Sequence, residues 1–167
     1  DDEWIPTNPA SRMGRLIGHS KPSAEKVNAL SWEEKAKLEE TFEKHYPRYY
    51  PLFLTAMRTG MRLGEIIALK PGDLDFNGGF IEVQRSVSMG KVTTPKSKER
   101  RRVDMSQGLA KVLRAHLVER KKEALKRGWG EPPEWLFYNE AGNMIDNFNL
   151  RKRVFYKAQE EKTKDLK

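Results

Sequence analysis

The chain has 167 residues, of which 37% are hydrophobic and 34% are charged, and it contains no cysteine. This length suits one domain, and the lack of cysteine excludes both a disulfide framework and a thiolate metal site. No apolar run approaches the roughly 20 residues of a membrane span, and no signal-peptide pattern opens the chain. We therefore expect a cytoplasmic protein without membrane contact. Because it begins with Asp1 and not with Met, we also expect a piece excised from a longer chain.

Positive charge is concentrated in the second half of the chain, although the formal net charge of the whole is only +8. Residues 1–90 hold 12 Lys and Arg against 13 Asp and Glu, whereas residues 91–167 hold 20 against 11. A basic half joined to a near-neutral half suggests a surface for a polyanion, with nucleic acid first among the candidates. The alternative is a well-solvated basic surface without such a partner.

The first 60 residues predict a linker followed by two helices. Residues 1–29 carry three prolines and little apolar periodicity, which is typical of a linker or an extended arm. Ser31 can cap a helix in which Glu34 completes a capping box, and we expect this helix to end near position 44. A second helix over residues 48–59 has almost no polar face, which predicts a buried position. Gly60 is expected to end it in the left-handed conformation.

The pattern changes period after a third, short helix that we expect over residues 61–69. Residues 80–85 alternate between two faces, which is typical of a strand. Further extended pieces are expected over residues 91–94 and 101–105, with a charged turn between them. We predict that these three pieces form a three-stranded antiparallel sheet.

A long helix is expected after the strands, with Ser106 as its N-cap and its end near Gly128. Its predicted apolar stripe consists of Leu109, Val112, Leu113, Leu117, Ala124 and Leu125. A loop rich in Pro, Gly and Trp follows, and Asp146 is placed to start the last helix. The predicted fold class is therefore α+β and mostly helical, with a small three-stranded antiparallel sheet.

Residues 59–65 read TGMRLGE and are the most informative stretch. Because Gly60 ends one helix and the next begins at once, we expect Arg62 in a first helical turn, where free N–H groups and the dipole favour an anion. Its guanidinium is a fixed fork of donors suited to two phosphate oxygens. Glu65 lies three residues further on, where its carboxylate can orient that guanidinium. The alternative is an ordinary Arg–Glu pair on a helix surface.

This stretch resembles the first motif of the tyrosine recombinase, or phage integrase, family. That motif is Thr-Gly-x-Arg-x-x-Glu followed by Leu-x-x-x-Asp-(Leu/Ile)-Asp, and residues 69–75 here read LKPGDLD. In the family the arginine grips the scissile phosphate and the acidic residue supports it. The resemblance therefore implies that Arg62 and Glu65 are catalytic and supporting residues.

The similarity extends to both sides of this motif and covers nearly the whole chain. Asn8-Pro9-Ala10 looks like the family's linker, LSWEE at positions 30–34 like its first helix, and LFY at 136–138 with Gly142 like the strand and turn after the long helix. The resemblance implies that residues 1–29 are an arm from a preceding core-binding domain. It also implies that residues 30–167 are an incomplete catalytic domain, with helices packed around the small sheet.

A basic run covers positions 96–102, with five cations in seven positions. In the family, a lysine in the context Pro-Lys-(Thr/Ser)-x-x-x-Arg, between the second and third strands, gives a proton to the departing 5′-oxygen. Lys96 matches this lysine, and Lys98 and Lys91 are close enough to be alternatives. Further cations are expected to contact DNA: Lys91, Lys98, Arg100, Arg101 and Arg102. The alternative is a solvated hairpin turn, and residues 103–105 read VDM where the family often has Val-Pro-Leu, which leaves the strand register open.

The family completes its site with His-x-x-Arg, a later His or Trp, and a nucleophilic Tyr, and we expect none of these in this chain. His116 falls on the apolar stripe and is expected to pack in the core, while His45 lies at a helix end. Tyr156 is late in the chain but lies where the family has a structural helix. The late-motif look-alike LIGHS at positions 16–20 lies at the wrong end.

The resemblance implies a DNA recombinase that breaks and rejoins double-stranded DNA through a 3′-phosphotyrosine intermediate, without a metal or other cofactor. Its full-length parent would be a homo-oligomer, a tetramer on DNA, in a nucleoid-associated setting of bacterial, phage or mobile-element origin, and the fragment alone would be inactive. One alternative is a non-catalytic DNA-binding module that retains the fold. Another is a basic RNA-binding protein, which is less favoured because the chain lacks an aromatic-rich strand on which bases stack.

Overall fold

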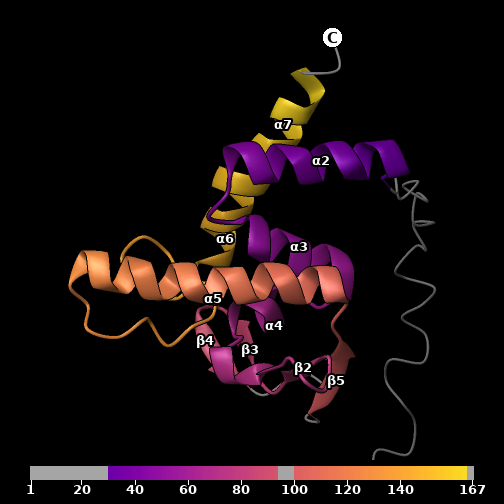
Figure 1. Cartoon of the computed structure of the whole chain (residues 1–167). Helices are drawn as coiled ribbons and strands as arrows, with labels where there is room; N and C mark the ends of the chain where they lie inside the picture. The colour runs from indigo at the N-terminus through magenta and orange to yellow at the C-terminus, as the bar shows by residue number, and fades with distance from the viewer. Residues whose placement is uncertain (1–29, 94–99, 165–167) are drawn as a thin grey trace, which may run out of the picture. The chain divides into compact units, whose positions relative to one another are not determined.

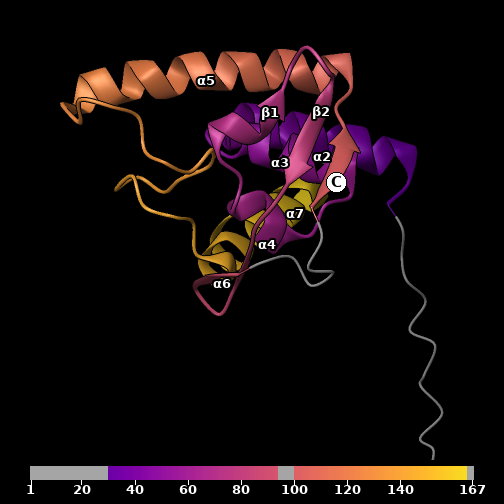
Figure 2. The same cartoon turned by 90° about the horizontal axis from the view of Figure 1, so that it is seen from below.

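The computed structural model describes residues 30–93 and 100–164, and the chain divides into two units, Asp1–Ser31 and Trp32–Lys167. The linker expected over residues 1–29 lies outside the described residues. In the second unit a small sheet lies on one side, helices α2 and α7 lie on the other, and α3, α4 and α5 lie between them (Figures 1 and 2).

The first two helices of this unit pack through aromatic rings. α2 (Trp32–His45) lies within one residue of its predicted ends, and α3 (Tyr50–Thr59) begins two residues later than expected. Phe42 of α2 stacks on Phe53 of α3, with ring centroids 4.0 Å apart. Residues 51–55 are all buried, which confirms the central position predicted for α3.

A left-handed glycine separates α3 from α4 (Leu63–Ile67). Gly60 has a φ of 61°, and its N–H donates to the carbonyl of Ala56 at 3.0 Å, as predicted for a helix C-cap. α4 is shorter than expected because Arg62 and Ala68 are its caps and not helical residues. Both isoleucines of α4 are fully buried, so this short helix is nevertheless part of the core.

The sheet has three antiparallel strands, as predicted, but not the three that the sequence suggested. Its order is β1 (Leu74–Asp75), β2 (Phe80–Val83) and β5 (Arg101–Asp104). The expected member at residues 91–94 instead forms β4 (Lys91–Thr93), which pairs with β3 (Ser86–Ser88) in a separate hairpin.

Two local features accompany this difference. The β2–β5 ladder ends at Val83, and the Arg85 guanidinium beyond it donates to the carboxylate of Asp73. Met89 and Gly90 then adopt positive φ values of 49° and 73°, and this tight turn pairs β4 with the strand directly before it. The alternating pattern in the sequence predicts neither of these features.

The long helix α5 (Gln107–Arg127) has the predicted caps but only part of the predicted stripe. Ser106 accepts a hydrogen bond from the Leu109 N–H at 3.3 Å, and Gly128 is left-handed. Leu113 is fully buried, whereas Leu125 is 76% exposed, so the stripe was wrong at its far end. There the helix extends past the core and packs against its own returning loop (Figure 1).

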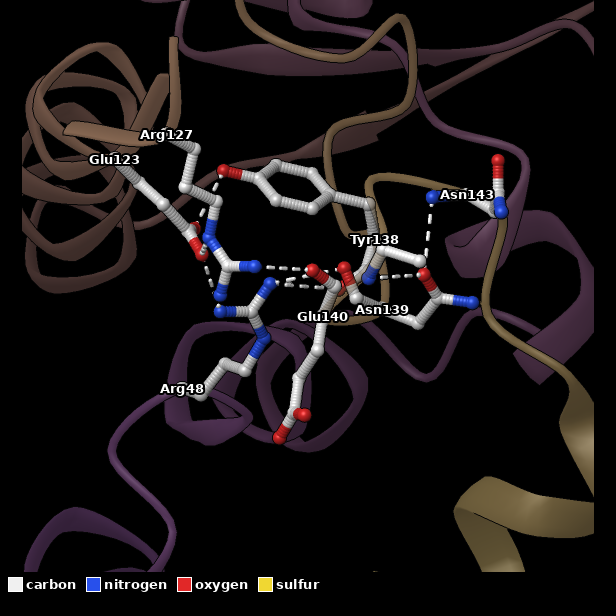
Figure 3. Close-up of polar contacts among 8 residues, drawn as sticks. Arg48, Glu123, Arg127, Tyr138, Asn139, Glu140 and Asn143 are labelled. Atoms are coloured by element: carbon white, nitrogen blue, oxygen red, sulfur yellow. Dashed lines mark hydrogen bonds and ion pairs between the residues drawn. The ribbon is translucent and has the colours of Figure 1, made fainter. Parts of the chain in front are cut away.

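Polar contacts hold that loop to α5 and to the turn before α3 (Figure 3). Arg48 donates to Glu123 at 2.9 Å and to the carbonyl of Asn139 at 3.1 Å. The Tyr138 hydroxyl donates to the other oxygen of Glu123 at 2.9 Å, and Arg127 donates to the carbonyl of Glu140 at 2.6 Å. The strand expected at 136–138 is reduced to a single bridge between Tyr138 and Met144, and the next two carbonyls accept from arginine side chains and not from another strand.

The last helical stretch begins at Asp146, as predicted, where the carboxylate accepts from the Asn149 N–H at 2.7 Å. It runs through α6 (Asn147–Leu150), a π-helical turn (Arg151–Phe155) and α7 (Tyr156–Lys164). α7 packs against α2, and the Phe155 ring lies beside Phe42 at 5.3 Å between centroids. The last helical stretch thus packs on the same side of the unit as α2.

Candidate active site

Arg62 lies in the bend between α3 and α4, and its side chain is 69% exposed. Its backbone is extended, with φ −65° and ψ 142°, so it is the N-cap of α4. The prediction that it lies within the first helical turn was therefore wrong. Met61 and Arg62 join the left-handed Gly60, which ends α3, to the first helical residue of α4 at Leu63. A five-residue helix has a small dipole, so affinity for an anion here depends on the guanidinium itself.

Glu65 is a buried carboxylate that holds Arg62 at two points. It is 1% exposed. One oxygen accepts from the backbone N–H of Arg62 at 3.0 Å, and the other accepts from its Nη1 at 3.3 Å. The backbone contact is half of a capping box, from the third helical residue to the N-cap. The supporting contact suggested by the sequence is therefore present, although it engages the guanidinium at one atom.

The strongest partner of Glu65 is Arg101, a residue that the sequence suggested for DNA contact. Its Nη1 and Nη2 donate to the two carboxylate oxygens at 2.8 and 2.7 Å, which is a bidentate pair. The hydrogen bond from Arg101, together with those from Arg62, lowers the pKa of Glu65 to about 2 in spite of burial. Arg101 lies 36 residues further along the chain. A sequence signal did exist, since strand alternation puts residue 101 on the same face as the apolar Val103.

Backbone contact holds the hairpin β3–β4 against α4. A Cβ on Gly64 would lie 2.4 Å from the carbonyl oxygen of Val87 and 3.0 Å from the hydroxyl of Ser86. No side chain fits at this position, so Gly64 is required where the two backbones meet. The glycine therefore places the hairpin directly beside the residues that carry Arg62 and Glu65.

The three lysines considered as the general acid lie on or next to this hairpin in the sequence. Lys91 begins β4, pairs with Ser88, and is exposed. Lys96 and Lys98 fall within residues 94–99 and lie outside the described residues, so their roles remain predictions. The segment that carries them joins β4 to β5 and is followed closely by Arg101.

The arginines of β5 face opposite sides of the sheet. Arg101 lies on the core side with Glu65, and Arg102 therefore lies on the other. The guanidinium of Arg102 is 4.3 Å from the centre of the Phe80 ring, in a cation–π contact. Arg100 is exposed at the start of the strand. Arg101 and Arg102 cannot both contact the same DNA surface from one face of this sheet.

The second part of the motif, LKPGDLD at residues 69–75, fixes the turn that follows α4. Asp73 is 5% exposed and forms a bidentate pair with Arg85 at 2.6 and 2.5 Å. It also accepts from the backbone N–H of Lys70 at 2.7 Å. This carboxylate therefore joins the end of α4 to the end of β2, which keeps the sheet and the Arg62 bend in register. We assign it a structural role.

Among the described residues, His116 packs beside the core and His45 is the last residue of α2. Nε2 of His116 lies 3.0 Å from the carbonyl oxygen of Leu136, and burial lowers its pKa to about 4, which confirms the predicted packing role. Positions 45–48 read HYPR and do spell His-x-x-Arg, so the expectation that the chain lacks this pattern was wrong. Arg48, however, is bound to Glu123 in the loop network of Figure 3.

The tyrosine hydroxyls also have local partners. Burial and the hydrogen bond to Glu123 raise the pKa of Tyr138 to about 12. Tyr156 is 48% exposed, and its hydroxyl accepts from Nη2 of Arg151 at 3.2 Å. Neither contact is with Arg62 or Glu65, and the nucleophile stays unassigned among the described residues.

A second basic surface, which sequence analysis missed, lies between the tip of hairpin β3–β4 and the last helical stretch. Phe148 is 70% exposed and Tyr156 is 48% exposed. Lys152 and Arg151 lie over these two rings, at 5.9 and 6.0 Å from their centres. The signal was available in the sequence, because residues 148–157 read FNLRKRVFYK and combine three aromatic residues with four cations.

The described part of the chain holds no group of three or more His, Asp and Glu side chains that could bind a metal ion. None of its helices is both long enough and apolar enough to cross a membrane.

The fold matches that of the tyrosine recombinase catalytic domain. A variant of the Tn1549 transposon integrase, in complex with transposon right end DNA, matches with a TM-score of 0.76 and 18% identity over 98% of this chain and 53% of that chain. The same integrase with circular intermediate DNA matches at 0.67 and 19%, over 81% and 46%. XerA recombinase matches at 0.61 and 22%, over 80% and 42%.

The model of the phage integrase family matches residues 25–166. The chain therefore belongs to the phage integrase family. A sequence search of curated proteins gives no significant match. The chain spans about half the length of the solved structures that it resembles. Their TM-scores show a common fold, and at identities this low they show the fold alone. This confirms the predicted class, mostly helical with a small antiparallel sheet.

Proposed function

We propose that this chain is part of a site-specific recombinase that breaks and rejoins double-stranded DNA through a 3′-phosphotyrosine intermediate. The observation that carries this proposal is the exposed guanidinium of Arg62, oriented by the buried carboxylate of Glu65 within the family's first motif. Two of the similar structures show the Tn1549 transposon integrase in complex with DNA, which supports DNA as the partner.

The proposed chemistry needs cations on the non-bridging phosphate oxygens and an acid for the leaving oxygen. Arg62 supplies two donors to the phosphate, and Glu65 keeps it in place. Lys96 protonates the 5′-oxygen, as an ammonium beside a phosphate can. The phosphate charge is thereby met by side chains, and no metal or other cofactor is required.

Other cations hold the DNA backbone around this phosphate. We assign Lys91, Lys98 and Arg100 to this role, and Arg102, which lies on the opposite face of β5, to a backbone contact further from this phosphate. The surface of Phe148 and Tyr156, with its two cations, extends it beyond hairpin β3–β4. In the full-length parent, two or more copies act together, with a tetramer on DNA as the expected form, in a nucleoid-associated setting of bacterial, phage or mobile-element origin.

Duplex binding at several salt concentrations tests the role of Arg62. Affinity should fall steeply with salt, by about 0.9 log units per log unit of salt for each phosphate contact, and Arg62→Ala should lower this slope by about one. Lys126→Ala is the matched control, since it removes one exposed charge at the far end of α5. Equal effects of the two substitutions would reduce Arg62 to a general surface charge. Stronger binding to single-stranded RNA than to duplex DNA would favour the RNA-binding alternative.

A nicked suicide substrate tests the chemistry. We expect this chain alone to form no covalent adduct, and the full-length parent to form one. Absence of the adduct from both would favour the non-catalytic DNA-binding module. A covalent band from the chain alone, mapped to one of its five tyrosines, would contradict the incomplete site.

A sulfur-substituted substrate separates the acid from the phosphate-binding residue in the parent. Sulfur in place of the 5′-oxygen leaves without a proton, so it should restore cleavage to Lys96→Ala but not to Arg62→Ala. Rescue of Lys98→Ala in place of Lys96→Ala would move the acid to the neighbouring lysine. Rescue of neither would make the lysine a backbone contact.

A further inference from the structure

Glu65 has two arginine partners, and they share it unequally. Arg101 occupies both carboxylate oxygens, at 2.8 and 2.7 Å. Arg62 is left with one side-chain contact, at the longer distance of 3.3 Å. A guanidinium carries five N–H donors, so most of those on Arg62 have no partner among the residues that the structure describes, and its side chain is 69% exposed.

We propose that Arg101 is a positioning residue, which occupies Glu65 so that the guanidinium of Arg62 stays available to a DNA phosphate. A carboxylate and a guanidinium three residues apart at a helix start can form their own bidentate pair. Arg101 fills the two oxygen positions that such a pair needs. Arg62 is then restrained by its backbone N–H and by one side-chain bond, while its remaining donors face solvent.

The position of Arg101 in the fold suits this role. It begins β5 opposite the buried Val83, so the sheet fixes its backbone. Its side chain is 37% exposed against 69% for Arg62, and Glu65 raises its pKa, so it stays charged. Arg101 therefore acts on DNA through Glu65 and Arg62.

A double-mutant cycle on binding of a short DNA duplex tests this inference, which rests on the proposed function of Arg62. We expect Arg62→Ala to weaken binding about tenfold, as loss of a charge-assisted contact does. Arg101→Met should weaken it in the wild-type background, because Glu65 then captures Arg62. In the Arg62→Ala background, Arg101→Met should lower affinity only by the small effect of removing a distant charge. Any further change in affinity should be less than twofold. Full additivity of the two effects would show direct DNA contact by Arg101 and overturn the inference.

Nitrogen NMR of the arginine side chains in the unmutated chain supplies an independent readout. Arg101 should show slow rotation of its guanidinium, as a bidentate pair does, and Arg62 fast rotation that slows when the duplex is added. Slow rotation of Arg62 before DNA is added would overturn the inference, even if Arg101→Met failed to fold. If Arg62→Ala left duplex affinity unchanged, the proposed function of Arg62 would fail, while the rotation rates would still test the role of Arg101.

Arg101→Lys is the conservative variant. A lysine keeps a positive charge beside Glu65 but cannot occupy both oxygens as a planar fork does. We therefore expect an affinity between those of the wild type and Arg101→Met, together with slower rotation of Arg62. Wild-type affinity and wild-type rotation in both variants would overturn the inference.

Discussion

Removing the charge of Glu65 should destabilise the protein in a way that depends on pH. The carboxylate is buried, and its hydrogen bonds from Arg101 and Arg62 lower its pKa from 4.5 to about 2. At about 1.4 kcal/mol for each pKa unit, this difference contributes on the order of 3 kcal/mol to stability at neutral pH. Because the pKa is lower in the folded state, the contribution is complete above about pH 4.5 and is lost as the pH falls toward 2.

Urea unfolding of the wild type and of Glu65→Gln at pH 7, 5 and 3 measures this contribution. The variant should be less stable by about 3 kcal/mol at pH 7, and the two proteins should approach each other as the pH falls below 4.5. Glu119→Gln is the control, since Glu119 is 66% exposed and pairs with Lys122 on the surface, where such pairs contribute about 0–1 kcal/mol. A constant difference between wild type and Glu65→Gln from pH 7 to pH 3 would refute the reasoning.

Three further predictions concern packing and hydrogen bonding in the fold, each tested by thermal or urea unfolding. Gly64→Ala should destabilise by about 1–3 kcal/mol, because its Cβ would meet a backbone carbonyl of β3, whereas Gly72→Ala, with open space around it, should change little. Leu113→Ala should lose about 2–5 kcal/mol and Leu125→Ala close to nothing, since their exposed fractions are 0% and 76%. Tyr138→Phe should lose about 1 kcal/mol with its hydrogen bond, and the change in absorbance from its ionisation, expected near pH 12, should disappear.

Local features of the fold could be predicted from the sequence because their causes are local. Ser106, Gly60 and Gly128 cap helices through hydrogen bonds to residues a few positions away. The Asp146 start is of the same kind. The predicted pair of Arg62 and Glu65 lies within four residues, and the structure contains it.

Features that depend on distant residues could not be predicted in the same way. The bidentate pair between Glu65 and Arg101 crosses 36 positions. The charge run around residue 101 suggested only a uniform basic surface. In the same way, the far end of α5 has an apolar pattern at Leu125 but no core opposite it, and the buried residue there is Arg120, which binds the carbonyls of the returning loop.

The register of β5 decides which arginine reaches Glu65. Val103 pairs with Ile81, and the N–H of Met105 donates to the carbonyl of Gly79 at 2.8 Å, so the apolar residues at 103 and 105 fix the strand. A shift by one residue would exchange its two faces and would put Arg102 in place of Arg101. Asp104, where the family often has proline, lies exposed on the other face. The departure from Val-Pro-Leu therefore leaves intact the alternation that delivers Arg101 to Glu65.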